Sequence, residues 1–521
     1  MRTEDAMRNL AIFGAVLLAL SLPAAGSAQE RSEARPESRG ILALLPSPAT
    51  SEHSVAVAGR TLDYEAQAGT VALLDGSGAE TAKVFYVAYS AKPGGGAGPG
   101  APARPVTSVF NGGPGAASAY LNLGALGPRL LVTSAAGEFL PPPQQLADNP
   151  DTWLDVTDLV FVDPPETGYS RVAPGQDAKS SWGVDQDASA MGTFIRLYLL
   201  QANRMSSPVF LAGESYGGFR AALLAKTLQQ DIGIMPRGLV LISPALEFSF
   251  LQPDEFEPLH WSFELPAMAA VELNRQGVRG PDFGARLAEV EEYALSDYLV
   301  ATASGLEAGR DAASGAVARF TGLPIELVRQ HFGRVPLPVF AKEFDRAEGK
   351  VLSRYDGTVT TADIAPKSDR PGTPDPILDR SVPVVTAAFV DYVRNELNYR
   401  TDISYRLLNG EAARSWDYGN SPTRQGYAGV LDALQEARAL NPALQVLIAH
   451  GYTDLITPYM MSRYLVRQLP TLPGAKPIVM RVYEGGHMMY LRPASRAALK
   501  HDVAALYSAA ETPGPDPAPA P

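Results

Sequence analysis

The sequence of 521 residues contains no cysteine. Disulfide bonds are therefore excluded, and an exported form of the protein must derive its stability from its core alone. A lipid anchor on cysteine, a cysteine nucleophile and thiolate metal ligands are excluded for the same reason. We expect oxygen or nitrogen groups to carry any chemistry of this chain.

Positive charge and histidine are also scarce. The chain has 44 Lys and Arg residues against 56 Asp and Glu residues, a net charge of −12, and no run of basic residues. Nucleic acids and anionic membranes attract clustered Lys and Arg, so neither is an expected partner. The six histidines show no spacing typical of a metal site. We expect no metal and no organic cofactor.

The N-terminal residues 7–28 (MRNLAIFGAVLLALSLPAAGSA) begin with a cation, continue as an apolar run and end in small residues. This order is typical of a signal peptide, which we place at residues 1–28 with cleavage after Ala28. The alternative is a membrane anchor, but the stretch from Leu10 to Leu22 is shorter than the ~20 residues of a spanning helix. We expect a periplasmic or extracellular protein that has no membrane anchor after cleavage.

Short apolar runs rich in Val, Ile and Phe recur along the chain, each followed by Gly, Asp, Asn or His and then by a helical pattern. Runs that are apolar at every position predict strands buried on both faces, as in a mostly parallel sheet flanked by helices, an α/β fold. Two earlier runs, 70–74 and 84–89, predict an antiparallel edge. The predicted parallel strands are 106–110, 158–162, 209–212, 239–242, 446–449 and 479–483.

The strand pattern stops between residues 247 and 441, where helical and Pro-rich pieces follow one another. We interpret this segment as a mainly helical cap inserted into one core, whose first part is 51–246 and whose second part is 442–510. Residues 29–50 and 511–521 are polar and contain Pro, and we expect both to be disordered.

Two local patterns complete the organisation. The Gly- and Pro-rich stretch 92–105 predicts a surface loop. After Asp185, apolar residues at spacings of three and four predict a packing helix. They are Ala188, Met191, Ile195, Tyr198 and Leu199.

A serine stands in the segment 213–217 (GESYG), between the predicted strand 209–212 and a helical run that begins near Arg220. Strand, sharp turn and helix in this order form the context of the nucleophile elbow of α/β-hydrolases. The glycines leave room for the crossing backbone, so that the Ser215 hydroxyl stands exposed above the sheet. We predict that Ser215 is a nucleophile.

A serine nucleophile needs a base and an acid that orients the base. His487 follows the last predicted strand and Asp454 follows the strand before it, so both should lie at the sheet edge that carries Ser215. The order Ser, Asp, His is typical of α/β-hydrolases. The alternatives are a surface-loop histidine and a helix-capping aspartate. His450 is a competing base, whereas His53, His260, His331 and His501 follow no predicted strand.

The oxyanion of an acyl-transfer intermediate needs two hydrogen-bond donors, usually backbone N–H groups. The run 111–115 (NGGPG) follows the strand 106–110 and can bring its backbone close to a substrate. The N–H of Tyr216, directly after the nucleophile, is the second expected donor. The alternative for the first run is an ordinary Gly-Pro turn.

These motifs together resemble the serine carboxypeptidase family of the α/β-hydrolase superfamily. The resemblance spans about Thr107 to Leu491 and implies a serine-type carboxypeptidase of α/β-hydrolase fold with peptide substrates. In that family the positions of Asn111, Gly112 and Glu214 bind the free carboxylate of a peptide's C-terminal residue. The motifs are 110–115 (FNGGPG), 158–164 (DLVFVDP) with 167–170 (TGYS), 213–218 (GESYGG) and 485–488 (GGHM).

The expected mechanism has Ser215 attack the scissile carbonyl while His487 takes its proton and Asp454 holds the imidazole. The N–H groups of Gly113 and Tyr216 bind the oxyanion. A carboxyl next to a bound carboxylate is driven toward its protonated form, so peptide binding should be tighter at acidic pH.

Two positions depart from the family pattern. Val109 and Ala116 stand where relatives commonly have Trp and Cys, and the missing indole removes one carboxylate donor. An esterase or acyltransferase on the same triad is therefore the main alternative. A non-catalytic binding protein of hydrolase fold is a remote one, because a pure binder does not need a triad. The sequence does not determine the oligomeric state.

Overall fold

The computed structural model describes residues 40–92, 103–251, 256–369, 374–419 and 428–511. The predicted signal peptide, most of the predicted loop 92–105 and all but the first residue of the predicted disordered tail 511–521 lie outside the described residues. Within the described ranges, no helix combines the length and the apolar character that crossing a membrane requires.

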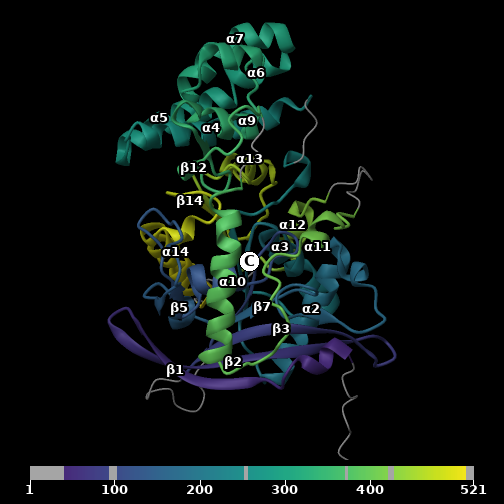
Figure 1. The fold of residues 1–521 in the computed structure, drawn as a ribbon. Helices are drawn as coiled ribbons and strands as arrows, with labels where there is room; N and C mark the ends of the chain where they lie inside the picture. The colour runs from purple at the N-terminus through teal and green to yellow at the C-terminus, as the bar shows by residue number, and fades with distance from the viewer. Residues whose placement is uncertain (1–39, 93–102, 252–255, 370–373, 420–427, 512–521) are drawn as a thin grey trace, which may run out of the picture. The chain divides into compact units, whose positions relative to one another are not determined.

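A ten-stranded sheet organises the described chain (Figure 1). Neighbouring strands from β7 to β14 run parallel, whereas β1, β2 and β3 pair antiparallel with one another and β3 pairs antiparallel with β7. The short strand β8 (Arg171–Val172) pairs with β3. The order across the sheet is β1 (Ala49–Val57), β2 (Arg60–Leu74), β3 (Glu80–Ala91), β7 (Asp158–Val162), β4 (Val106–Phe110), β9 (Val209–Glu214), β10 (Gly238–Ile242), β13 (Gln445–Gly451) and β14 (Ile478–Tyr483).

The central strands are buried along their whole length, which confirms the predicted parallel sheet. Successive residues of one strand enter different cores: Val109 packs in the cluster on one face and Phe110 in the cluster on the other. Because both faces are covered, apolar side chains point to both faces of these strands rather than to one face alone.

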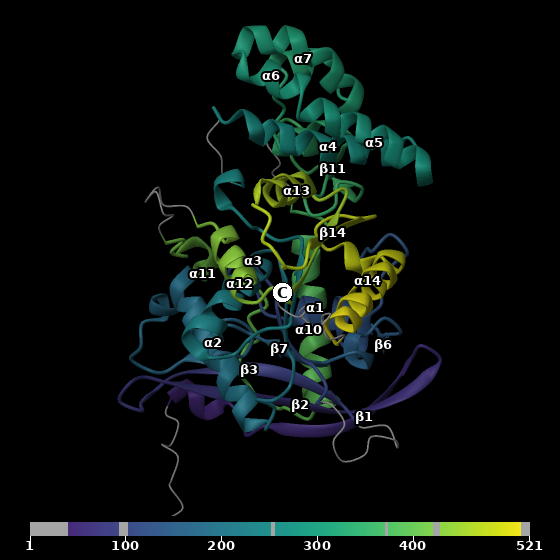
Figure 2. The same cartoon turned by 180° about the vertical axis from the view of Figure 1, so that it is seen from behind.

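Helices cover the two faces of the sheet. One face packs against α10 (Leu378–Asn395) and α14 (Pro493–Glu511), and the other against α2 (Val184–Gln201), α3 (Tyr216–Thr227) and α12 (Leu431–Leu440). Figure 2 shows α14 and α2 on opposite sides of the strands. The five apolar residues that predicted the helix after Asp185 are all buried in α2, which confirms that prediction. Shorter elements are α1 (Ala119–Leu121), β5 (Arg129–Leu131), β6 (Leu146–Asp148), α11 (Gly410–Arg414) and α13 (Tyr459–Gln468).

The chain between β10 and β13 contains two differently packed parts. One group of helices shares a hydrophobic cluster separate from those of the sheet. In contrast, α10 and α12 bury their apolar faces on the sheet, so the packing separates two parts of the segment that the sequence analysis treated as one cap. The separate group is α4 (Pro258–Arg275), α5 (Gly280–Ala294), α6 (Asp297–Ala303), α7 (Leu306–Thr321), α8 (Ile325–Gln330) and α9 (Leu337–Glu343), followed by the hairpin β11 (Lys350–Leu352) and β12 (Thr360–Ala362).

Residues 40–50 differ from the prediction of disorder for 29–50. They form a 3-10 helix, Gly40–Leu44, and the start of β1. Leu42 and Leu45 are buried in the cluster on one face of the sheet. The prediction was wrong for this part because it weighed the polar composition of the whole segment, whereas two leucines three residues apart suffice to dock it.

Candidate active site

Ser215 lies on the turn between β9 and α3, as the elbow motif predicted. Its backbone has φ 58° and ψ −123°, a conformation that costs a non-glycine residue energy and is held by its surroundings. The Ser215 N–H donates to the Ile242 carbonyl at 2.9 Å. A Cβ at Gly213 would lie 1.9 Å from the Gly217 carbonyl oxygen, so the turn needs glycine there. The Ser215 side chain is partly exposed.

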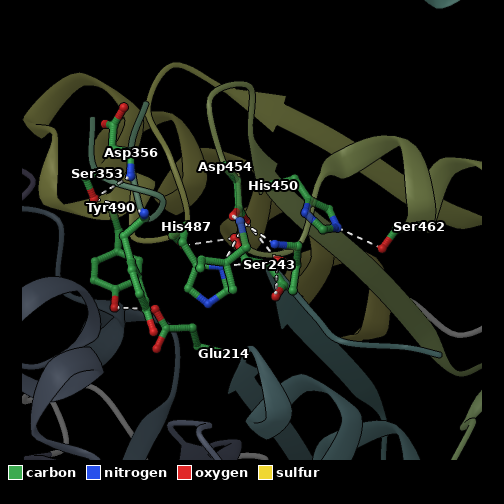
Figure 3. Close-up of polar contacts among 12 residues, drawn as sticks. Glu214, Ser243, Ser353, Asp356, His450, Asp454, Ser462, His487 and Tyr490 are labelled. Carbon is green, nitrogen blue, oxygen red and sulfur yellow. Dashed lines mark hydrogen bonds and ion pairs between the residues drawn. The ribbon is translucent and has the colours of Figure 1, made fainter. Parts of the chain in front are cut away.

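Asp454 and His487 follow β13 and β14, and the structure brings them into contact. His487 Nδ1 lies 2.9 Å from Asp454 Oδ2, and both side chains are buried (Figure 3). The N–H groups of Ile456 and Thr457 donate to Asp454 Oδ1 at 2.8 and 3.0 Å. In the neutral ring, with Nδ1 donating to Asp454, the other ring nitrogen of His487 is an acceptor.

The charges of this pair shift both pKa values. Burial opposes the charged form of Asp454, but attraction to His487 and the hydrogen bonds outweigh it, so the pKa of Asp454 lies below its ordinary value. Burial likewise lowers the pKa of His487, but Asp454 and then Glu214 raise it above its ordinary value overall. The pair therefore favours a protonated imidazole next to an ionised carboxylate.

The loop after β10 connects the elbow with the histidine. The Ala245 N–H donates to the Ser215 carbonyl at 3.2 Å, and the Ser243 hydroxyl donates to the His487 carbonyl at 2.9 Å. Thr457 Oγ1 lies 2.8 Å from Asp454 Oδ2 and 3.1 Å from His487 Nδ1. Ser243 and Thr457 were not predicted as site residues, because neither belongs to one of the sequence motifs.

The run after β4 lies directly against the elbow. A Cβ at Gly112 would come within 2.6 Å of the Tyr216 nitrogen and 2.8 Å of Ser215 Cβ. Gly113 has φ +100° and, with Ser215, lines a cavity of about 500 Å³. The predicted donors Gly113 and Tyr216 therefore lie on two backbone segments that meet beside the serine.

Glu214 is buried between two polar side chains. Asn111 Nδ2 donates to one carboxylate oxygen. The Tyr490 hydroxyl donates to the other at 2.6 Å (Figure 3). Burial raises the pKa of Glu214 although His487, Tyr490 and Asn111 act in the opposite direction. Asn111 is itself fixed, because its Oδ1 accepts the Leu121 N–H at 3.0 Å. Tyr490 was missed because nothing in the sequence marks it apart from its position three residues after His487.

A buried ion pair contacts the backbone of Asn111. Arg220 Nε donates to Asp187 Oδ2 at 2.6 Å, and its Nη1 donates to the Asn111 carbonyl at 2.9 Å. Arg220 and Asp187 are 1% and 2% exposed, so water does not screen the pair. The sequence signal for this pair is Arg220, a charged residue in the otherwise apolar start of α3.

His450, the competing base, lies on the far side of Asp454 from His487 (Figure 3). Its Nε2 lies 2.8 Å from the Ser462 hydroxyl, and burial lowers its pKa to about 4. A neutral histidine bonded to Ser462 has a packing role. His260, which follows no strand, nevertheless lines the cavity next to Ser215.

A mostly parallel sheet with a serine on a strained strand-to-helix turn, and an acid-paired histidine after a later strand, defines the α/β-hydrolase fold. Residues 60–235 match the sequence model of the serine carboxypeptidase family. This match supports, over that part of the chain, the resemblance seen in its motifs. The match covers Asn111 and Ser215 but ends before Asp454 and His487.

Two relatives illustrate the similarity. The pheromone-processing carboxypeptidase KEX1 of Yarrowia lipolytica is 33% identical over 142 residues, which are 26% of this chain and 21% of the relative. The match thus spans about a fifth of that relative's length. The crystal structure of Kex1Δp, a prohormone-processing carboxypeptidase from Saccharomyces cerevisiae, has a TM-score of 0.53 at 15% identity. It covers 85% of this chain and 91% of that one, and it shows that the fold is shared.

Proposed function

We propose that the protein is a serine-type carboxypeptidase that releases C-terminal amino acids from peptides through an acyl-enzyme. The observation that carries the proposal is Glu214, a buried carboxyl directly before the nucleophile, held by Asn111 and Tyr490. A hydrolase that only needed a triad would have no physical use for a desolvated carboxyl there, because its burial is costly. The family match over residues 60–235 supports the same activity.

In the proposed mechanism, Ser215 attacks the scissile carbonyl while His487 takes its proton and Asp454 holds the imidazole in one tautomer. The N–H groups of Gly113 and Tyr216 stabilise the oxyanion. His487 then protonates the leaving amine, and water hydrolyses the acyl-enzyme. The Asp454 to His487 distance of 2.9 Å supports this assignment of roles.

Asn111, Glu214 and the Gly112 N–H would bind the terminal carboxylate of the peptide. Two carboxyl groups at hydrogen-bond distance share a proton, so the bound state favours protonated Glu214. Burial already raises the pKa of Glu214 in the free protein, which supports binding that is favoured at acidic pH. The negative charge of the peptide's terminal carboxylate would raise the pKa of Glu214 further.

An esterase or acyltransferase is the second candidate, and Val109 is the observation that favours it. This buried residue supplies no hydrogen-bond donor where relatives commonly have Trp. The chemistry at Ser215 would be unchanged, and an ester or an alcohol acceptor would take the place of the peptide or of water. A purely binding function is less favoured, because a binder needs no buried acid paired with a histidine.

The decisive experiment compares an N-blocked dipeptide with a free carboxylate against its C-terminal amide. We expect the free acid to be turned over at least tenfold faster, since Glu214 and Asn111 hold only the acid. Ser215→Ala is the control and should abolish turnover and labelling by a fluorophosphonate. Equal turnover of acid and amide would contradict the carboxypeptidase proposal and favour the esterase.

We further propose that the protein is exported and acts on peptides outside the cytoplasm, with residues 1–28 removed. N-terminal sequencing of the protein recovered from the periplasm or medium tests this proposal. A mature protein that begins after Ala28 is the expected result. Retention of the first residues in a membrane fraction would contradict it.

A further inference from the structure

The cavity of about 500 Å³ that opens at Ser215 extends toward helix α4. Most of its walls are apolar, and none of Asn111, Glu214 and Tyr490 lines it. It therefore lies on a different side of Ser215 from the group proposed to hold the terminal carboxylate. The apolar walls include Phe248, Leu251, Leu337, Ile456 and Met461.

The α4 wall of this cavity carries a buried carboxylate. Glu264 Oε1 lies 3.1 Å from His260 Nε2, and the Glu264 side chain is 5% exposed. Glu264 Oε2 has no hydrogen-bond partner among the described residues. A buried carboxylate oxygen without a donor is costly, so a donor from outside the chain would stabilise it.

Besides His260 and Glu264, the cavity is lined by the charged side chain of Arg354, which is exposed. Water and salt screen its charge, whereas the charge of Glu264 acts in a desolvated site where electrostatic interactions are stronger. His260 Nε2 lies 3.1 Å from one oxygen of Glu264, and the other oxygen has no partner among the described residues. Burial raises the pKa of Glu264, whereas His260 acts in the opposite direction, as a further cationic donor would. The inner part of the cavity therefore attracts a cationic donor.

We propose that this cavity binds the side chain of the residue preceding the one released, and that Glu264 makes it selective for a basic side chain, Lys or Arg. Such side chains have an aliphatic stem that packs on apolar walls and a cationic tip that donates hydrogen bonds. The apolar walls match the aliphatic stem, and Glu264 Oε2 matches the cationic tip. This inference rests on the proposed carboxypeptidase function.

The test uses N-blocked dipeptides that differ only in the residue before the C-terminal one: Lys, Gln or norleucine. Norleucine keeps the stem of Lys without the charge, and Gln offers an uncharged donor. We expect kcat/KM for Lys to exceed that for norleucine by about 10- to 100-fold, the effect of a hydrogen bond between charged groups. Glu264→Gln should bring the ratio close to one, mainly through the loss of the Lys peptide.

Glu272→Gln is the matched control. Glu272 is a buried carboxylate on the same helix, but its partner is Arg275 and it does not line the cavity. This variant should keep the Lys to norleucine ratio of the unmodified protein. Arg354→Gln should not lower the ratio, because it removes a repulsive charge. Fluorophosphonate labelling of Ser215 reports whether each variant is folded.

Three outcomes would overturn the inference: equal turnover of Lys and norleucine peptides by the unmodified protein, preference for Gln over Lys, or a Lys preference that survives Glu264→Gln. The preference for Gln would indicate that the Trp261 indole N–H, also buried without a partner among the described residues, decides recognition. Absence of turnover for all three peptides, with Ser215 still labelled, would instead contradict the proposed function itself.

Discussion

The Tyr490 hydroxyl donates a 2.6 Å hydrogen bond to the buried carboxylate of Glu214, 276 residues earlier in the chain. This bond stabilises the ionised form of Glu214, whereas burial favours the protonated form. The loop that carries His487 thus also affects the charge of Glu214, the residue before Ser215. The charge of Glu214 also raises the pKa of His487, so the protonation of the two groups is coupled.

Tyr490→Phe removes that donor and should raise the pKa of Glu214. Protonated Glu214 would persist to higher pH, so the rise of KM for a free-carboxylate dipeptide should begin at higher pH. Because Glu214 also loses a positioning contact, kcat/KM should fall by about five- to tenfold, the effect of a hydrogen bond worth ~1 kcal/mol. The pH profiles of KM for the dipeptide and its amide measure this. An equal loss for both substrates would show that Tyr490 only supports the fold.

Glu214→Gln removes an anion that raises the pKa of His487. The pKa of His487 should fall, and since only neutral His487 can accept a proton, Ser215 should stay reactive to lower pH than in the unmodified protein. The pH dependence of fluorophosphonate inactivation measures this directly, without peptide binding. Glu484→Gln is the control, because Glu484 is exposed three residues before His487 and should not shift the profile. An unchanged profile for Glu214→Gln would show that the two groups are not coupled.

Arg220→Met leaves Asp187 buried without its partner. We expect a loss of about 3–5 kcal/mol in the free energy of unfolding, as for other broken buried pairs. Arg329→Met is the control, because Arg329 and Glu326 are 53% and 82% exposed in their pair, and it should cost less than about 1 kcal/mol. Denaturant unfolding of both variants tests the difference. Similar losses would mean that burial does not govern the Arg220 pair.

Gly213→Ala places a Cβ 1.9 Å from the Gly217 carbonyl oxygen, which is backbone and cannot move without opening the elbow. We expect loss of Ser215 labelling together with a lower melting temperature. Gly315→Ala on α7 is the control, since a Cβ there meets nothing within 4 Å and should stabilise the exposed helix by about 0.5–1 kcal/mol. A Gly213→Ala protein that labels normally would contradict the steric account of the elbow.

The sequence predicted the features that depend mainly on neighbouring residues in the chain. Apolar runs such as 239–242 became strands because a segment without polar side chains is stable when both of its faces are buried. The turn at Ser215 followed from small residues between a strand and a helix. The positions of Asp454 and His487 followed from the rule that the carboxyl ends of parallel strands share one edge.

The sequence by itself therefore determined the parallel sheet, the elbow and the meeting of the acid with the histidine. Tertiary structure alone decided which distant groups share a desolvated volume: Tyr490 with Glu214, Arg220 with Asn111, and Glu264 with the cavity at Ser215. The spacing of apolar residues in the sequence predicts which face of a helix or strand is buried. It does not predict which other residues that face contacts. Charge and hydrogen-bond complementarity act through space, so the groups that tune this site appear only once the chain is folded.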